Sequence, residues 1–258
     1  MKRILILLAA AAMCLCATAA KPKKSNDITA TSAEVKGVWK AGEQVSLFNS
    51  YSDAGSVYTC KSLGFTTVLQ GKGSVTNDEG YRCAVYPASC VRIWTPANAH
   101  IIIPREQTAK LNGYPEDGVL LSACSKTRDL VFEPVMGYIK FTIDKETPAT
   151  SAVMVKVNKN ISGTFKIRMN DPQMKVEFEN VDPNWHEVLL KSADGAALAP
   201  GTYYVGLFAR VLPDGMTIER FSPDGSSTQI PVPAKIVINK GQAFDAGTLR
   251  AESLTLTK

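Results

Sequence analysis

Histidine and catalytic sequence motifs are scarce in this chain of 258 residues. Only His100 and His186 are present, and there is no C-x-x-C, H-E-x-x-H or G-x-S-x-G motif and no phosphate-binding glycine loop. These absences remove the usual sequence signatures of zinc sites, serine hydrolases and nucleotide-binding enzymes. Five aspartates adjoin proline or glycine, where turn formation explains them: Asp171, Asp182, Asp194, Asp214 and Asp224. We therefore predict that the protein is not an enzyme and holds no metal or cofactor.

A strong excess of one charge is also missing. Lys and Arg number 29 and Asp and Glu number 24, so the formal net charge is +5. Nucleic-acid-binding domains usually carry a larger basic excess gathered on one face. We therefore predict no nucleic-acid partner.

Helical periodicity is absent after the N-terminal segment. Apolar residues instead alternate with polar ones, as in Val153–Val157, where Val153, Val155 and Val157 are separated by Met154 and Lys156. Successive side chains of a strand point to opposite faces, so this period of two predicts strands with one buried face. The predicted strands are Val45–Phe48, Val57–Cys60, Thr66–Leu69, Arg82–Tyr86, Ile101–Ile103, Ile139–Ile143, Val153–Val157, Phe165–Met169, Met174–Phe178, Trp185–Leu190, Thr202–Arg210, Met216–Phe221, Lys235–Asn239 and Phe244–Leu249. The chain is predicted to be all-β.

Turn residues separate these strands. Asp-Gly, Pro-Asp-Gly and Lys-Gly sequences supply the backbone angles of tight turns, and they end at Gly195, Gly215, Gly225 and Gly241. Many short strands with such spacing indicate β-sandwiches. The best domain boundary is Lys145–Ser151, which contains Pro148. We predict one domain over residues 20–147 and a second over residues 148–258.

The N-terminus has the features of a secretory signal peptide. Lys2 and Arg3 precede an apolar run over Ile4–Cys16, and small residues follow. The best cleavage site is after Ala19, within an A-x-A-like exit. The alternative is a membrane anchor, but the run is shorter than the roughly 20 apolar residues that a bilayer requires. We predict residues 1–19 to be removed on export.

Two cysteines in this segment raise the alternative of a lipoprotein. A bacterial lipobox has a small residue directly before the modified cysteine, whereas Met13 precedes Cys14 and Leu15 precedes Cys16. A free N-terminus is therefore the preferred interpretation. Association with the outer membrane is expected only if one of these cysteines is lipidated.

Four cysteines remain after the signal peptide: Cys60, Cys83, Cys90 and Cys124. An oxidising compartment permits disulfides, and four cysteines allow three pairings. The alternative is that some of them are small buried apolar residues. The sequence leaves the pairing open.

Three tryptophans are the aromatic candidates for a sugar-binding surface: Trp39, Trp94 and Trp185. Aromatic residues at strand ends more often close a core. A carbohydrate-binding module therefore stays an alternative function. A secreted β-sandwich hydrolase is a further alternative, which would require two carboxylates about 5 to 10 Å apart in a cleft.

Several ordered segments together resemble the fimbrillin-like fimbrial subunits of Bacteroidales. They are Val38–Phe48, Tyr81–Ser89, Ile101–Thr108, Leu130–Ile143, Ile161–Phe165, Leu198–Val205 and Asn239–Gly247. The resemblance implies two tandem transthyretin-like β-sandwich domains. It also implies a structural or adhesive role at the cell surface, in a fimbrium or in the periplasm. The implied partners are other fimbrial subunits or ligands on host or bacterial surfaces.

One part of the family pattern is missing. In polymerising members, an arginine-specific protease removes the first strand, and a strand of the neighbouring subunit replaces it. This chain has no arginine between Arg3 and Arg82, which favours an accessory, anchoring or non-polymerising subunit. If it does polymerise, the predicted donor strand is Ser253–Thr257, with Leu254 and Leu256 on one face. The alternative is an ordinary last strand or a tail.

Overall fold

The computed structural model describes residues 27–48, 56–72, 80–95, 98–168, 176–178 and 184–250. Strands dominate these residues, and their helical content is limited to two single 3₁₀ turns, η1 (Ala88–Cys90) and η2 (Glu116–Gly118). The all-β prediction is confirmed. None of the helices in these ranges has the length and apolar character to cross a membrane.

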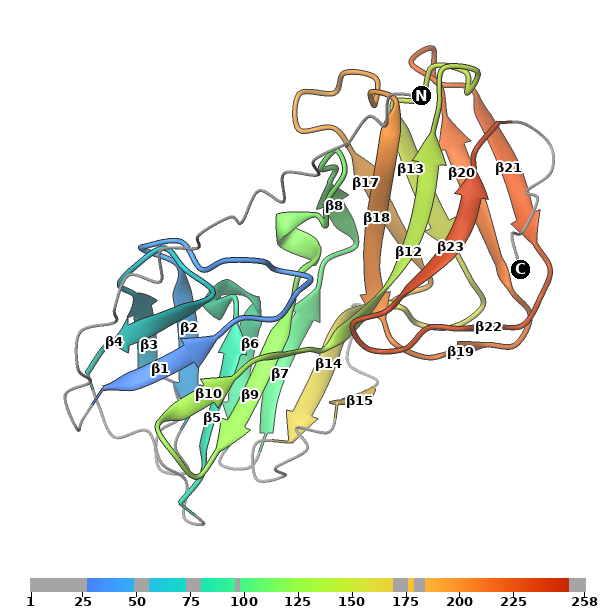
Figure 1. Cartoon of the computed structure of the whole chain (residues 1–258). Helices are drawn as coiled ribbons and strands as arrows, with labels where there is room; N and C mark the ends of the chain where they lie inside the picture. The colour runs from blue at the N-terminus through green and yellow to red at the C-terminus, as the bar shows by residue number, and fades with distance from the viewer. Residues whose placement is uncertain are drawn as a thin grey trace, which may run out of the picture.

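The strands form two lobes, which Figure 1 shows at the lower left and the upper right. The first lobe contains an eight-stranded sheet in the order β10 (Asp129–Val131), β1 (Ile28–Thr31), β4 (Thr66–Gln70), β3 (Ser56–Cys60), β2 (Gln44–Phe48), β5 (Arg82–Tyr86), β9 (Leu121–Ser125) and β11 (Glu133–Pro134). Its two end strands, β10 and β11, are separated in the chain only by Phe132. The sheet therefore curls back towards itself.

A second sheet completes the first lobe. Its order is β15 (Val176–Phe178), β14 (Ser162–Arg168), β7 (Asn98–Ile103) and β6 (Val91–Thr95), and β16 (Asn184–Trp185) also pairs with β14.

The second lobe has two larger sheets and a short ribbon. One sheet is β18 (Gly201–Phe208), β12 (Met136–Ile143) and β23 (Ala243–Thr248). The other is β21 (Ser227–Val232), β20 (Met216–Phe221), β13 (Ala152–Lys156), β17 (Glu187–Lys191) and β8 (Glu106–Thr108). The ribbon pairs β19 (Val211–Leu212) with β22 (Ile236–Val237).

Each lobe has its own hydrophobic core. In β13, Val153 and Val155 are fully buried while Met154 and Lys156 are only partly buried, as the alternation predicts. The 14 predicted strands all correspond to strands of the structure, although several bounds differ by a few residues and β22 is much shorter than predicted. The predicted turns are confirmed by positive φ angles at Gly195, Gly215, Gly225 and Gly241.

The two lobes exchange strands. β12 contributes Tyr138 to the first core and Phe141 to the second. β14 follows β13 in the chain but pairs with β7, so Phe165 lies in the first core. Conversely, β8 comes from the first half of the chain and pairs in parallel with β17.

The predicted boundary segment has a defined place in this arrangement. Residues 144–151 connect β12 to β13, and Thr150 is buried, with its carbonyl accepting from the Leu198 N–H at 2.7 Å. A division of the chain at residues 147/148 would therefore separate β14 from β7. The domain boundary at residues 147/148 stays a prediction.

The four cysteines of the mature chain have different environments. Cys83 in β5 and Cys124 in β9 are direct cross-strand partners joined by a disulfide, with their Cα atoms 4.1 Å apart. Cys60 and Cys90 are free and buried. Burial raises the pKa of the Cys60 thiol to about 11, and the nearby Glu43 charge adds to this shift. Burial likewise raises the pKa of the Cys90 thiol.

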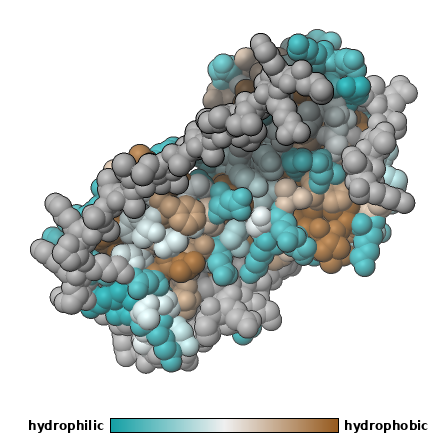
Figure 2. Space-filling view, in the orientation of Figure 1, coloured by the Kyte–Doolittle hydropathy of each residue, from teal (hydrophilic) through white to brown (hydrophobic). Residues whose placement is uncertain are grey.

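The surface includes one small apolar ribbon. Figure 2 shows an apolar patch at the lower right, where Figure 1 places β19 and β22. Their cross-strand partners Val211 and Val237 are 45% and 49% exposed, whereas the adjacent Leu212 and Ile236 are buried in the second core. The ribbon thus has one buried face and one solvent-exposed face.

The predictions for the two ends of the chain lie outside the described residues. These are the cleavage site at Ala19, the lipidation candidates Cys14 and Cys16, and the donor-strand residues Leu254 and Leu256.

Candidate functional site: a cavity between two loops

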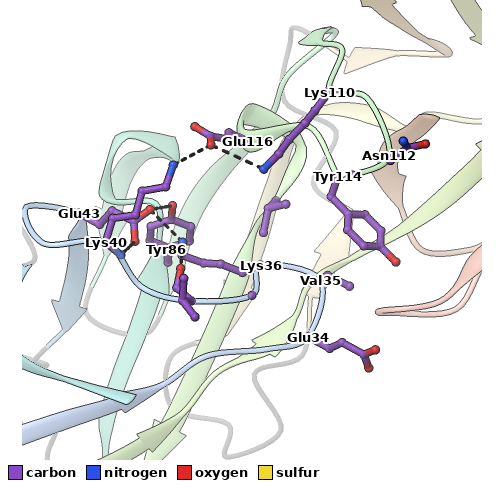
Figure 3. A pocket seen from close by; sticks show the side chains of 14 residues that line it. Glu34, Val35, Lys36, Lys40, Glu43, Tyr86, Lys110, Asn112, Tyr114 and Glu116 are labelled. Carbon is purple, nitrogen blue, oxygen red and sulfur yellow. Dashed lines mark hydrogen bonds and ion pairs between the residues drawn. The ribbon is translucent and has the colours of Figure 1, made fainter. Parts of the chain in front are cut away.

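A cavity of about 340 Å³ lies where two loops face each other (Figure 3). One wall is the loop 34–43, which connects β1 to β2. The other is the segment 110–119, which leads from β8 through η2 towards β9. Tyr86, the last residue of β5, closes the back. The cavity therefore depends on a loop of the first lobe and on a segment that starts from a sheet of the second.

The back wall is a buried ion pair between aromatic rings. The Lys36 side chain is only 6% exposed, and its Nζ donates to Glu43 Oε1 at 2.9 Å and to the Val38 carbonyl at 3.2 Å. The ammonium lies 5.1 Å from the Trp39 ring centroid and 4.8 Å from that of Tyr86. The Tyr86 hydroxyl donates to Glu43 Oε1 at 3.0 Å. The two charges neutralise each other and have hydrogen-bond partners, so this wall is structural.

The same network perturbs the Tyr86 hydroxyl. Burial raises its pKa, and the Glu43 carboxylate raises it further. Tyr86 therefore stays a neutral hydrogen-bond donor, and this side chain has no role as a base at neutral pH.

At the rim of the cavity, two lysine side chains lie close to one carboxylate. Lys40 Nζ lies 2.8 Å from Glu116 Oε1, and Lys110 Nζ lies 3.8 Å from the same oxygen. All three side chains are more than half exposed. The hydrogen bond with Glu116 raises the pKa of Lys40 and lowers that of Glu116. The ion pair of Lys40 with Glu116 joins the two walls across the opening.

An aromatic cluster fixes the third side. The Tyr114 ring packs against Tyr204 with centroids 4.3 Å apart and against the edge of Tyr138 at 4.6 Å. Tyr138 is fully buried, and its hydroxyl has no hydrogen-bond partner among the described residues. Tyr114 is held between these rings and remains partly exposed towards the cavity.

Backbone contacts hold the wall 110–119 on the second lobe. The Gln107 amide makes two hydrogen bonds to the backbone of Gly206, at 2.6 and 2.9 Å, and is buried. Asn112 has a φ of 54°, a left-handed conformation that Asn tolerates. Its Oδ1 accepts from the Thr202 N–H at 3.0 Å, and its own N–H donates to the Thr202 carbonyl at 2.8 Å. The cavity wall is thereby fixed to β18.

Two carboxylates of the cavity already have hydrogen-bond partners. Glu43 already accepts from Lys36 and Tyr86, and Glu116 from Lys40. The residues that line it include no histidine, cysteine or serine. Within the described ranges, no group of three or more His, Cys, Asp or Glu side chains is placed to hold a metal ion.

The other candidates from the sequence lie elsewhere. Trp39 is fully buried in the first core, as its strand-end position predicts. Trp185 is half-buried under the Arg105 guanidinium, 5.9 Å from its ring. The Trp94 side chain lies outside the described residues.

The histidines and aspartates also have structural explanations. His100 lies in β7 opposite Lys166, because this strand begins three residues before the predicted start at Ile101. His186 is exposed between β16 and β17. Asp194 and Asp224 accept from backbone N–H groups two residues ahead, which confirms their role in turns. Asp171 and Asp182 lie outside the described residues.

The chain is similar in fold to solved proteins from Bacteroides. One is a proposed cell adhesion protein from Bacteroides ovatus ATCC 8483, with a TM-score of 0.56, 15% identity, and coverage of 90% of this chain and 94% of that one. Another is a proposed cell adhesion protein from Bacteroides uniformis ATCC 8492, with a TM-score of 0.52, 10% identity, and coverage of 87% and 93%. No protein-family model matches the sequence, and no curated protein aligns with it. The β-sandwich-like fold expected from the resemblance is confirmed, and identities this low establish the fold alone.

Proposed function

We propose that this protein is an exported, fimbrillin-like surface protein that acts in adhesion as an accessory, anchoring or non-polymerising subunit. The observation that carries the proposal is the shared fold with the Bacteroides ovatus protein over 90% of this chain and 94% of that one. Because the match includes both lobes, it concerns the whole architecture and not a common sandwich module alone. The signal-peptide features of residues 1–19 support export to the surface or the periplasm.

The structure is consistent with a role in contact. Its two cores are connected by exchanged strands, and the cavity between the two loops has room for a small ligand. We accordingly propose that the protein has no catalytic activity, cofactor or nucleic-acid partner. Its proposed partners are other fimbrial subunits or ligands on host or bacterial surfaces. Outer-membrane anchoring would require lipidation of Cys14 or Cys16.

Surface display is the first test of this proposal. The gene is expressed in a Bacteroides host, and antibodies against the purified chain are applied to intact and to lysed cells. We expect labelling of intact cells and loss of the protein when these cells are treated with protease, with a periplasmic protein as the protected control. A signal confined to lysed cells would contradict surface display.

Adhesion is the second test. Beads coated with the mature chain, residues 20–258, are incubated with bacterial and epithelial cells, and beads coated with the heat-unfolded chain serve as the control. We expect binding only by the folded chain. Equal retention of the two kinds of bead would contradict an adhesive role. Mass spectrometry of the same preparation distinguishes cleavage after Ala19 from a lipidated cysteine.

A further inference from the structure

We propose that the cavity between the loops binds a sugar residue that carries a carboxylate, such as a hexuronic acid or a sialic acid, and that Glu116 holds the place of this carboxylate in the free protein. The inference rests on the proposed adhesive function and adds the chemical class of the ligand.

The rim presents two cations to one anionic position. Lys40 comes from one wall and Lys110 from the other, and both ammonium groups point to the same oxygen of Glu116, as Figure 3 shows. The pair of Lys36 and Glu43 behind them is neutral as a unit. Glu34 lies at the opposite end of the cavity in Figure 3. Without Glu116, the rim would therefore carry two uncompensated positive charges, and a ligand carboxylate can restore the balance.

Displacing the Glu116 carboxylate from the two lysines costs little free energy. The side chains of Glu116, Lys40 and Lys110 are 68%, 58% and 55% exposed. Ion pairs this exposed change an equilibrium constant by less than about fivefold. In contrast, the buried pair of Lys36 and Glu43 is held by several contacts and is not available for exchange. The rim is thus the part of the cavity where one carboxylate can replace another.

The remaining walls suit a sugar ring. Tyr114 presents an aromatic ring whose orientation is fixed by Tyr204 and Tyr138. Asn112 uses its Oδ1 for the backbone of Thr202, so its amide nitrogen is the group that can donate to a ligand hydroxyl. A volume of about 340 Å³ is within the range of small-ligand sites.

The position of the cavity argues against an extended peptide as the occupant. Peptides that add to sheets require the unpaired backbone of an edge strand. The cavity walls are the loops 34–43 and 110–119, and the strand residue Tyr86 belongs to β5, which has a partner on each side. A compact ligand with one charge fits these walls better than a strand.

The test is a calorimetric titration of the purified mature chain with glucuronic acid and with N-acetylneuraminic acid. Glucose, which lacks the carboxylate of glucuronic acid, is the neutral control. We expect saturable binding of at least one acid and at least tenfold weaker binding of glucose. Because these ammonium groups are exposed, we expect a loss of up to about fivefold for Lys40→Gln and for Lys110→Gln. Glu116→Gln removes the competing carboxylate and should tighten binding by up to about fivefold.

Matched controls come from another exposed ion pair. Lys191 Nζ lies 2.5 Å from Glu106 Oε2, and these side chains are 50% and 57% exposed. Lys191→Gln and Glu106→Gln make the same changes of charge at residues that do not line the cavity, and they should leave the affinity unchanged. Circular dichroism on each variant separates loss of binding from loss of structure.

Several results would overturn the inference. These are no binding of either acid, equal binding of glucose, weaker binding by a folded Glu116→Gln variant, and equal binding of a short glutamate-containing peptide. If cell adhesion and surface display persist while the acids fail to bind, this inference is wrong and the proposed function stands. If adhesion and display also fail, the proposed function is wrong as well.

Discussion

The buried pair of Lys36 and Glu43 offers a stringent test of how the first lobe is held together. Glu43→Gln keeps the size of the side chain but removes the charge that compensates an ammonium group on a side chain only 6% exposed. Removing one partner of a buried pair leaves an uncompensated charge in a medium of low polarity. We therefore expect the free energy of unfolding to fall by about 3 kcal/mol. For a chain of this size, that loss corresponds to a decrease of about 6 to 12 °C in Tm.

Two further variants isolate the physical cause. The double variant Lys36→Met and Glu43→Gln removes both charges, so it should recover most of the lost stability. Glu116→Gln removes a carboxylate from an exposed ion pair and should change the free energy of unfolding by less than about 1 kcal/mol. Urea and thermal denaturation of the mature chain measure all three. The reasoning is refuted if Glu43→Gln is as stable as the natural chain, or if the double variant is no more stable than the single one.

Three other predictions concern the disulfide, the pH dependence and the C-terminal tail. Replacing Cys83 and Cys124 together by serine should lower the free energy of unfolding by about 4 kcal/mol, because the disulfide closes a loop with a sequence separation of 41; urea denaturation with and without reductant measures this. Contacts with Lys156 and Ser227 lower the pKa of Glu219, so its stabilising contribution is present above the unfolded pKa of about 4.3 and is lost as the pH falls through the lower folded value. A Glu219→Gln variant should lose this part of the acid dependence in denaturation curves from pH 7 to 2. Deleting residues 252–258 should abolish ladders on non-boiled gels if a C-terminal strand is exchanged between subunits, and unchanged ladders would dismiss that exchange.

Alternation of side chains was sufficient to predict the strands that have one wet face. It worked for β13, whose bounds differ from the predicted ones by one residue at each end. It missed β9, Leu121–Ser125, because its first three residues are all buried and the sequence shows no alternation there. It also missed β21, which contains Pro231. A proline is compatible with this strand because β21 lies at the edge of its sheet.

The cavity was not predictable from local patterns. The ion pair at its rim joins residues 76 positions apart, and Tyr114 obtains its fixed orientation from Tyr138 and Tyr204 on two further strands. None of these residues has a local spacing that signals a site. The exchange of β8 and β14 between the lobes was likewise not predictable. The sequence of a strand indicates which of its faces is buried, but it does not indicate which lobe covers that face.

This exchange of strands has a mechanical consequence. A pull that draws the lobes apart cannot simply separate two preformed units, since β8 is paired with β17 on one side of the junction and β14 with β7 on the other. The continuous strand β12 runs through both lobes between them. Separation of the lobes therefore requires that both ladders of hydrogen bonds break.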